Sequence, residues 1–244
     1  MKYLLTASGR LALMEWMRGA PLLGFDFDGT LAPIVDTPML ATLRPRTREL
    51  LQALAARYSC VVLSGRARQD VQRRLADIPL REVFGNHGLE PWHISASLLR
   101  QVRQWHQILS ERLRGWPGVW IEDKDYSLSI HYRHSADPER TRKEALPILA
   151  LLRGARIISG KLVFNVMPTR VVHKGTAFTE AMRRFRRARA LYVGDDHTDE
   201  DIFTSCDPAQ VLGVHVGPSR TSRALYYLRR QEEMDELLEL LTKS

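Results

Sequence analysis

Two short acidic segments contain the residues of this chain that are best suited to chemistry. Asp26 and Asp28 stand two residues apart in Asp-Phe-Asp-Gly-Thr, directly after the apolar run 22–25. Residues 194–201 read Gly-Asp-Asp-His-Thr-Asp-Glu-Asp and also follow an apolar run. Carboxylates that gather in one crevice repel each other unless a cation lies between them, and hard oxygen ligands suit Mg²⁺. The two segments therefore predict a Mg²⁺ site, provided that the fold brings them together.

A serine and a lysine occupy comparable turns. Ser64 opens Ser-Gly-Arg after the apolar run 60–63, and Lys174 opens Lys-Gly-Thr before a predicted helix. A single lysine before a helix is usually solvated, and a serine after a strand usually caps the next helix. In an open parallel sheet, however, the carboxyl ends of the strands converge on one crevice. Together with the acidic segments, Ser64 and Lys174 are therefore predicted to contact a phosphate group.

The alternation of short apolar runs with helical patterns predicts an α/β protein with a parallel sheet. The predicted elements are strands over 22–27, 60–63 and 190–193 and a helix over 47–57. If the first strand continued through Asp28, Asp26 and Asp28 would lie on the same side of it. Three strands would then run into polar turns, which is where the candidate residues stand.

The middle of the chain follows a different pattern. The predicted elements are a helix over 97–116, strands over 119–121 and 126–133, a helix opened by Pro138, and strands over 155–159 and 162–167. Two strands, a helix and two strands predict a separate, smaller sheet domain. We place this domain at residues 92–168, inserted into a core formed by residues 1–91 and 169–244.

Polar residues on the strands of the smaller domain are candidates for ligand contacts. Glu122 and Lys124 lie two apart, so in a continuing strand they would face one side about 7 Å apart, which suits two hydroxyls of a polyol. Strict alternation follows in residues 127–133. It predicts that Leu128, Ile130 and Tyr132 pack inward while Ser129, His131 and Arg133 face outward. The outward set is equally compatible with a solvated sheet face.

The four turn motifs, taken in order, resemble those of haloacid-dehalogenase-superfamily phosphatases. The last motif is similar to that of the trehalose-6-phosphate phosphatase family. Further segments that resemble this family are 85–90, 122–124, 131–133 and 160–161, so the resemblance spans about residues 22–204. It implies a Rossmann-like core with a parallel sheet flanked by helices, and an inserted α/β cap domain that closes over the core and excludes water.

The resemblance also implies a role for each matching residue. Asp26 would be the nucleophile that takes the phosphoryl group, and Asp28 would be the general acid and base. The implied Mg²⁺ ligands are Asp26, Asp195 and the backbone carbonyl of Asp28, the implied phosphate contacts are Thr30, Ser64 and Lys174, and the residue implied to orient the metal waters or Lys174 is Asp199. Asp196 receives no assigned role.

Substrate contacts are implied from both domains. They are Arg66, Asn86, His87, Glu122, Lys124 and Asn165. The chain departs from the family at one of them, because Asn165 stands where the family pattern has a Glu before its proline. An amide both donates and accepts hydrogen bonds, whereas a carboxylate only accepts, so this departure weakens or retunes the binding of a sugar hydroxyl.

Three functions are compatible with these observations. The resemblance implies Mg²⁺-dependent hydrolysis of trehalose 6-phosphate to trehalose and phosphate. Asn165 leaves open a phosphatase for another sugar phosphate, such as sucrose 6-phosphate or a glycosyl-phosphoglycerate. The third function is a non-catalytic module that binds anions or nucleic acid. The acidic residues at 26, 28 and 195 argue against it, because binding an anion requires no such cluster.

Composition bounds the remaining possibilities. With 244 residues, of which 44% are apolar, the chain can bury a sizeable core, which excludes a disordered or disulfide-stapled protein. A net charge of +8 favours anionic partners, and the Arg-rich run 183–187 suits either a solvated helix face or nucleic acid. Cys60 and Cys206 have no metal or redox spacing. We expect a cytoplasmic monomer that binds a sugar phosphate and neither nucleic acid nor a membrane.

Overall fold

The computed structural model describes residues 1–91, 96–160, 162–169 and 173–243. The chain divides into two compact units, residues 1–91 with 172–244 and residues 92–171. The sequence predicts the two boundaries at 91/92 and 168/169. Lys161, from the Gly-Lys pair that resembles the family, lies outside the described residues. Among the helices that the structure describes, none is both long and apolar enough to cross a membrane.

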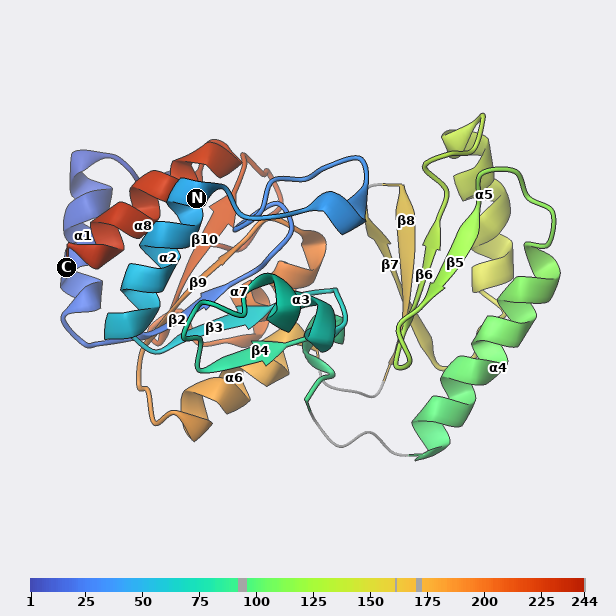
Figure 1. The fold of residues 1–244 in the computed structure, drawn as a ribbon, viewed down its shortest axis with the longest axis horizontal. Coiled ribbons are helices and arrows are strands. Elements are labelled where there is room, and N and C mark those ends of the chain that lie inside the picture. Colours follow the sequence, from blue (N-terminus) through green and yellow to red (C-terminus); the bar gives the residue numbers. More distant parts are fainter. Residues whose placement is uncertain (92–95, 161, 170–172, 244) are drawn as a thin grey trace. The chain divides into compact units, whose positions relative to one another are not determined.

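The first unit is built on a seven-stranded sheet whose neighbouring strands are all parallel. Its strand order is β1-β11-β10-β9-β2-β3-β4, and Figure 1 labels the five strands from β10 to β4. The strands are β1 (Lys2–Tyr3), β2 (Leu22–Phe25), β3 (Cys60–Leu63), β4 (Glu82–Phe84), β9 (Ala190–Gly194), β10 (Val211–Val216) and β11 (Tyr226–Leu228). Strands β2, β3 and β9 are buried along their whole length, as expected of central strands in a sheet covered on both faces.

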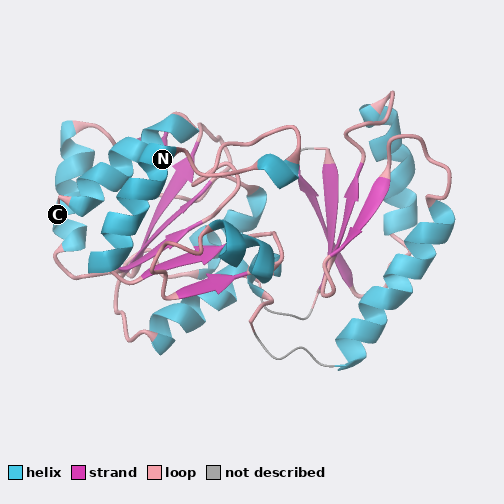
Figure 2. Cartoon of the chain, in the orientation of Figure 1, coloured by secondary structure: helices cyan, strands magenta, loops and turns pink. Residues whose placement is uncertain are grey.

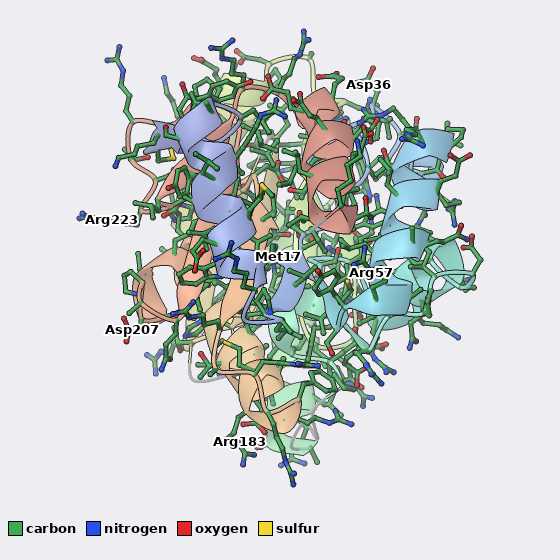
Figure 3. All side chains as sticks on the ribbon, turned by 90° about the vertical axis from the view of Figure 1, so that its left-hand side faces the viewer. Met17, Asp36, Arg57, Arg183, Asp207 and Arg223 are labelled. Atoms are coloured by element: carbon green, nitrogen blue, oxygen red, sulfur yellow. The ribbon has the colours of Figure 1, made fainter. Side chains whose placement is uncertain are left out.

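Three helices cover one face of this sheet. They are α1 (Ala7–Met17), α2 (Pro45–Arg57) and α8 (Met234–Thr242), which lie side by side in Figure 3. Leu13, Leu51 and Leu238 from these helices join Phe25 and Val193 of the sheet in one buried apolar cluster. This cluster anchors β2 and β9, the two strands that lead into the acidic segments.

The other face of the sheet is packed by α6 (Lys174–Arg184), which is joined by α7 (Glu200–Ser205), and helices flank the strands in Figure 2. Gly24 of β2 has no side chain because a Cβ there would collide with the ring of Phe178 on α6. Close packing at Gly24 therefore fixes the start of α6 relative to β2 and β9.

The remaining elements of the first unit are α3 (Arg68–Arg74) and the 3₁₀ turns η1 (Pro38–Leu40), η2 (Asn86–Gly88), η3 (His197–Asp199) and η4 (Gln231–Glu233).

The second unit is a four-stranded antiparallel sheet with two helices on one side (Figure 1). The strand order is β5 (Trp120–Asp123), β6 (Leu128–His131), β8 (Val163–Pro168) and β7 (Ala155–Gly160), and the helices are α4 (Ala96–Arg112) and α5 (Pro138–Leu149). Leu128, Ile130 and Tyr132 lie in the apolar core with residues of both helices, which confirms their predicted inward direction.

Some predicted boundaries are wrong for local reasons. Strand β2 ends at Phe25 rather than at residue 27, and the chain turns at Gly29, whose φ is +83°. Asp26 and Asp28 therefore do not share a strand face. Helix α4 ends at Arg112 rather than at residue 116, before Gly115, which has a φ of +79°, and Pro117, which is incompatible with a continuing helix. Short-range periodicity continues through such turns and does not mark them.

Candidate active site

Acidic residues meet at the carboxyl edge of the first unit's sheet. Asp26 follows β2, and Asp195 and Asp199 follow the neighbouring strand β9. One carboxylate oxygen from each of the three lies within 4.8 Å of the others. Asp26 and Asp199 are buried. The parallel sheet thus brings together residues that are about 170 positions apart in the chain, as the strand-end argument predicts.

Lys174 lies inside this acidic group. It begins α6, and its Nζ donates hydrogen bonds of 2.6 Å to Asp26 Oδ1 and 2.7 Å to Asp199 Oδ1. Its side chain is 2% exposed, so the ammonium group has left water and requires both carboxylates as partners. The prediction that a lysine before this helix does more than lie in solvent is consistent with that burial.

Burial and mutual repulsion dominate the electrostatics of the three carboxylates. Burial, followed by the charges of Asp199 and Asp196, raises the pKa of Asp195 to about 7. Burial also raises the pKa of Asp26 well above its ordinary value, although Lys174 opposes this effect. For Lys174 itself burial lowers the pKa, but the charges of Asp199 and Asp26 outweigh burial and raise it. Negative charge therefore exceeds what one lysine neutralises, and a cation beside Asp26 and Asp195 would relieve the excess.

The donor set beside Asp195 fits Mg²⁺. Thr30 donates its hydroxyl to Asp195 Oδ1 at 3.0 Å, and a Cβ on Gly29 would collide with the same carboxylate. The backbone after Asp28 therefore lies directly against Asp195. Carboxylate and carbonyl oxygens are the ligands that Mg²⁺ prefers. Of the three acids, Asp199 is the least available for a metal, because its oxygens already accept three hydrogen bonds from the protein.

Asp28 points to a different partner. Arg66 donates to both of its carboxylate oxygens, from Nε at 2.6 Å and from Nη2 at 2.7 Å. The same guanidinium also pairs with Asp70 at 3.1 Å and bonds the carbonyl of Pro38. Asp28 is 39% exposed, so it lies at the rim of the site while Asp26 lies at its base. The structure thus brings Arg66, a predicted substrate contact, onto the predicted acid and base.

The remaining predicted contacts of the first unit brace turns. Ser64 is buried after β3, and its Oγ accepts the backbone N–H of Arg66 at 3.1 Å. Asn86 donates to Glu90 Oε2 at 2.9 Å. The ring of His87 lies against Gly65, where a Cβ would be 2.8 Å from its Nε2. All three side chains therefore have close protein neighbours, and the packing of His87 explains why glycine follows Ser64.

The predicted contacts of the second unit share one sheet face. In the strand register Glu122 lies opposite Ser129, and Ser129 lies opposite Asn165. Ser129 donates to Asn165 Oδ1 at 2.7 Å. Lys124, just beyond the end of β5, places Nζ 3.6 Å from Glu122 Oε2. The row of carboxylate, hydroxyl and amide lies on the face opposite the helices, since the alternate residues of β6 form the apolar core.

Trp120 was not among the predicted contacts and His131 was predicted only to face outward, yet His131 contacts Glu122 and Trp120 stacks on His131. His131 Nε2 lies 2.8 Å from Glu122 Oε2, and its ring stacks on Trp120 with centroids 4.4 Å apart. Burial would raise the pKa of Glu122, but the hydrogen bond from His131 and the charge of Lys124 lower it below its ordinary value. The sequence contained one signal for this contact. Strand alternation predicts that His131 faces outward, which is the same face of the sheet as Glu122.

Tyr192 was also missed. The apolar run 190–193 predicts only a strand at this position, but the Tyr192 hydroxyl donates to Asp199 Oδ1 at 2.7 Å. A tyrosine in a buried strand needs a partner for its hydroxyl, and that requirement was the signal in the sequence.

The Arg-rich run 183–187 is engaged in local contacts. Arg183 pairs with Glu180 at 2.6 Å and Arg184 with Glu82 at 3.2 Å, while Arg187 donates to Ser59 Oγ at 3.1 Å. Figure 3 shows Arg183 at the surface of the first unit. These contacts support the solvated-face interpretation of the run.

Comparison with known proteins decides the family. The model of the trehalose-phosphatase family matches residues 24–231. The chain belongs to this family. Trehalose-phosphate phosphatase of Mycobacterium tuberculosis (strain H37Rv) is 31% identical over 247 residues, covering 91% of this chain and 61% of that protein. The protein of the same name in Mycobacterium marinum is 33% identical, with 88% and 60% covered. The chain thus spans about three fifths of the length of these relatives.

Solved structures of trehalose-phosphatase family members share the fold. The C-terminal domain of C. albicans trehalose-6-phosphate phosphatase superposes with a TM-score of 0.82 over all of this chain and 99% of that one, at 23% identity. Aspergillus fumigatus trehalose-6-phosphate phosphatase gives a TM-score of 0.68 at 26% identity, with 100% and 99% covered. The predicted fold class, a haloacid-dehalogenase core with a parallel sheet and a second, smaller α/β domain, is confirmed.

Proposed function

We propose that this trehalose-phosphatase family member is a Mg²⁺-dependent phosphatase that hydrolyses trehalose 6-phosphate to trehalose and phosphate. The observation that carries the proposal is Lys174, buried between Asp26 and Asp199 with Asp195 beside them. A buried cation between two carboxylates, in a group that still has excess negative charge, suits a dianionic phosphate bound with a divalent metal. The names of the relatives supply the substrate.

Asp26 is the nucleophile in this proposal. Its carboxylate attacks phosphorus, the bond from phosphorus to the sugar oxygen breaks, and that oxygen takes a proton from Asp28. A water molecule then attacks the aspartyl phosphate, Asp28 accepts the proton of the water, and the bond to Asp26 breaks to release phosphate. Lys174 holds the transferring oxygens, and Thr30 and Ser64 position the turns around them. When bound, Mg²⁺ would neutralise charge on the phosphate oxygens.

The residues that would hold Mg²⁺ are Asp26, Asp195 and the backbone carbonyl of Asp28. Asp199 would influence the site indirectly, by orienting Lys174 through the hydrogen bond between them. Arg66 orients the Asp28 carboxyl group by two hydrogen bonds. Phosphate release from a panel of sugar phosphates, with and without Mg²⁺, tests the proposal. Activity on none of them in the presence of Mg²⁺ would favour a module that only binds anions.

We propose the second unit as the cap that recognises the sugar. Its sheet face opposite the helices has Glu122 and Asn165 in one row, with Lys124 beside Glu122. Such a row can donate to and accept from the hydroxyl groups of a polyol.

We also propose a cytoplasmic location, because Cys60 and Cys206 are both free thiols, as is usual in a reducing compartment.

Replacing the cap residues is expected to separate sugar recognition from chemistry. Glu122→Ala and Lys124→Ala should each lower kcat/KM for trehalose 6-phosphate by about 10-fold or more, because a hydrogen bond to a charged group is lost. Hydrolysis of p-nitrophenyl phosphate should change by less than about twofold, since a small aryl phosphate needs only the first unit. Steady-state kinetics with both substrates measures the difference.

Glu144→Ala is a matched control for these variants. Glu144 is an exposed acid of the same unit, on α5, and pairs with Arg140 at 2.7 Å. Its removal should leave both substrates unaffected. Equal losses on both substrates for Glu122→Ala would contradict a role confined to the sugar.

A second candidate substrate follows from the hydrogen bond between Ser129 and Asn165. Ser129 already donates to one lone pair of Asn165 Oδ1, which favours the NH₂ group of Asn165 as the group that contacts a ligand. A donor suits a ligand acceptor, such as the carboxylate of a glycosyl-phosphoglycerate, better than a carboxylate side chain would. A phosphatase for such a sugar phosphate is therefore the alternative within the same chemistry.

Asn165→Glu distinguishes the two substrates. If the natural substrate is trehalose 6-phosphate, restoring the family's residue should preserve or raise kcat/KM for it, by up to about 10-fold for a hydrogen bond with a charged acceptor. Asn165→Gln controls for side-chain length without the charge. If Asn165→Glu instead abolishes activity on a glycosyl-phosphoglycerate that is the better substrate of the parent enzyme, the substrate assignment is wrong.

A further inference from the structure

Tyr192 is a fully buried tyrosine whose hydroxyl contacts the acidic group. It lies in β9, two residues before Gly194, and its side chain is 0% exposed. The hydroxyl donates to Asp199 Oδ1 at 2.7 Å. Burying a hydroxyl without a partner is costly, so this bond accounts for the presence of a tyrosine in an otherwise apolar strand.

The oxygen that Tyr192 contacts is the one that holds Lys174. Asp199 Oδ1 accepts from Lys174 Nζ at 2.7 Å as well as from Tyr192, while Asp199 Oδ2 accepts the backbone N–H of Asp196 at 2.9 Å. Lys174 in turn donates to Asp26 Oδ1 at 2.6 Å. Tyr192, Asp199, Lys174 and Asp26 therefore form one continuous series of charge-assisted hydrogen bonds.

The ring of Tyr192 is held in place by its neighbours. Phe178 and Phe203 pack against it edge-on, with centroids 5.1 Å and 6.0 Å away. On a third side Gly24 leaves the space open, since a Cβ there would lie 2.8 Å from the Tyr192 ring. A Cβ on Gly194 would collide with Asp199, so the backbone of β9 closes in on the carboxylate from the same strand. These contacts hold the ring in the position from which its hydroxyl donates to Asp199.

We propose that Tyr192 is a positioning residue for phosphoryl transfer, whose hydroxyl fixes Asp199 in the orientation that directs Lys174 onto Asp26. The proposal rests on the proposed function, because Asp26 and Lys174 are its reacting and phosphate-binding groups. Lys174 and the backbone N–H of Asp196 each hold one oxygen of the Asp199 carboxylate. The Tyr192 hydroxyl is a second donor to Oδ1, the oxygen that holds Lys174, and so narrows the positions that this oxygen and the ammonium group can take.

Tyr192→Phe removes one oxygen atom and keeps the ring packing. It should lower kcat for p-nitrophenyl phosphate by about 10-fold or more, with KM changed by less than about threefold, since the lost hydrogen bond is to a charged group. Asp199→Asn should also lower kcat. Because Tyr192 acts through Asp199, adding Tyr192→Phe to Asp199→Asn should cost less than about a further twofold. Tyr132→Phe, at a buried tyrosine of the second unit that packs on Phe164, is the matched control and should leave kcat unchanged.

The parent, Tyr192→Phe, Asp199→Asn and the double variant form a double-mutant cycle. Chemical denaturation of these four proteins gives a measurement that does not depend on catalysis. Tyr192→Phe should lower the denaturation midpoint of the parent, and should lower it less when Asp199 is already Asn. A Tyr192→Phe variant with kcat within twofold of the parent would overturn the proposal, as would losses that multiply in the double variant. A Tyr192→Phe chain that fails to fold where Asp199→Asn folds would also overturn it, because the tyrosine would then serve the core alone.

The failure of the proposed function would look different. A parent enzyme that releases phosphate from no ester would reject the function, while the denaturation cycle would still test the link between Tyr192 and Asp199. A parent that hydrolyses p-nitrophenyl phosphate but not trehalose 6-phosphate would reject only the substrate.

Discussion

Asp26→Asn is expected to reduce phosphate release by more than about 10⁴-fold, beyond the 10²–10⁴ usually contributed by one acid or base. An amide cannot form the acyl phosphate, and it also removes one of the carboxylates that would hold Mg²⁺. Asparagine has nearly the shape of aspartate, and Lys174 keeps its hydrogen bond to Asp199, so the fold should persist. Initial rates with p-nitrophenyl phosphate and trehalose 6-phosphate at saturating Mg²⁺, together with circular dichroism, measure both expectations.

Two further variants make this result specific. Asp207→Asn changes an exposed acid of the same unit, visible at the surface in Figure 3, and should leave the rate within twofold of the parent. Asp28→Asn should still permit phosphoenzyme to form from p-nitrophenyl phosphate, because that leaving group needs no protonation. A rate for Asp26→Asn within tenfold of the parent would exclude Asp26 as the nucleophile.

The convergence of the acidic group was predictable because it depends on topology. Once the apolar runs before Asp26, Ser64 and Asp195 were assigned to one parallel sheet, their ends had to share an edge. β2 lies between β9 and β3, so the three turns come from adjacent strands. No knowledge of distant contacts was needed for this step. Lys174 followed from its place before a helix together with the acidic partners that would draw it out of solvent.

The divergence of Asp26 and Asp28 was not predictable from the same argument. Period-two alternation holds only while the strand lasts, and β2 ends at Phe25. Beyond it, the turn at Gly29 sends Asp26 to Lys174 and Asp28 to Arg66. The end of a strand is decided by its neighbours in the sheet and by the turn, which local sequence patterns describe poorly.

Contacts across strands were missed for a related reason. Ser129 meets Asn165, and His131 meets Glu122, only because β5, β6 and β8 pair in one register. A shift of one residue would have moved either partner to the apolar face. The sequence specified which residues of β6 face outward, but not which residues of the other strands lie beside them.

Removal of Mg²⁺ is expected to stop turnover completely. Asp26, Asp195 and a phosphate dianion together carry more negative charge than Lys174 neutralises, and the raised pKa values of Asp26 and Asp195 already indicate an excess for the carboxylates alone. Phosphate release should cease in excess EDTA and return when Mg²⁺ is restored. Mg²⁺ should also stabilise the folded protein, by about 2.7 kcal/mol at a concentration 100 times its Kd.

Asp195→Asn separates the metal from the rest of the site. At pH 8 without Mg²⁺, this variant should be as stable as the parent or more stable, because it removes a charge that burial and two neighbouring carboxylates disfavour. The amide oxygen can still accept the hydrogen bond from Thr30. With Mg²⁺ present the order should reverse, since the parent gains binding energy that the variant lacks. Thermal melts of both proteins in EDTA and in a Mg²⁺ series measure this crossing. A parent whose melting temperature and phosphate release are the same in EDTA and in Mg²⁺ would refute the metal assignment, although the fold and the family would stand.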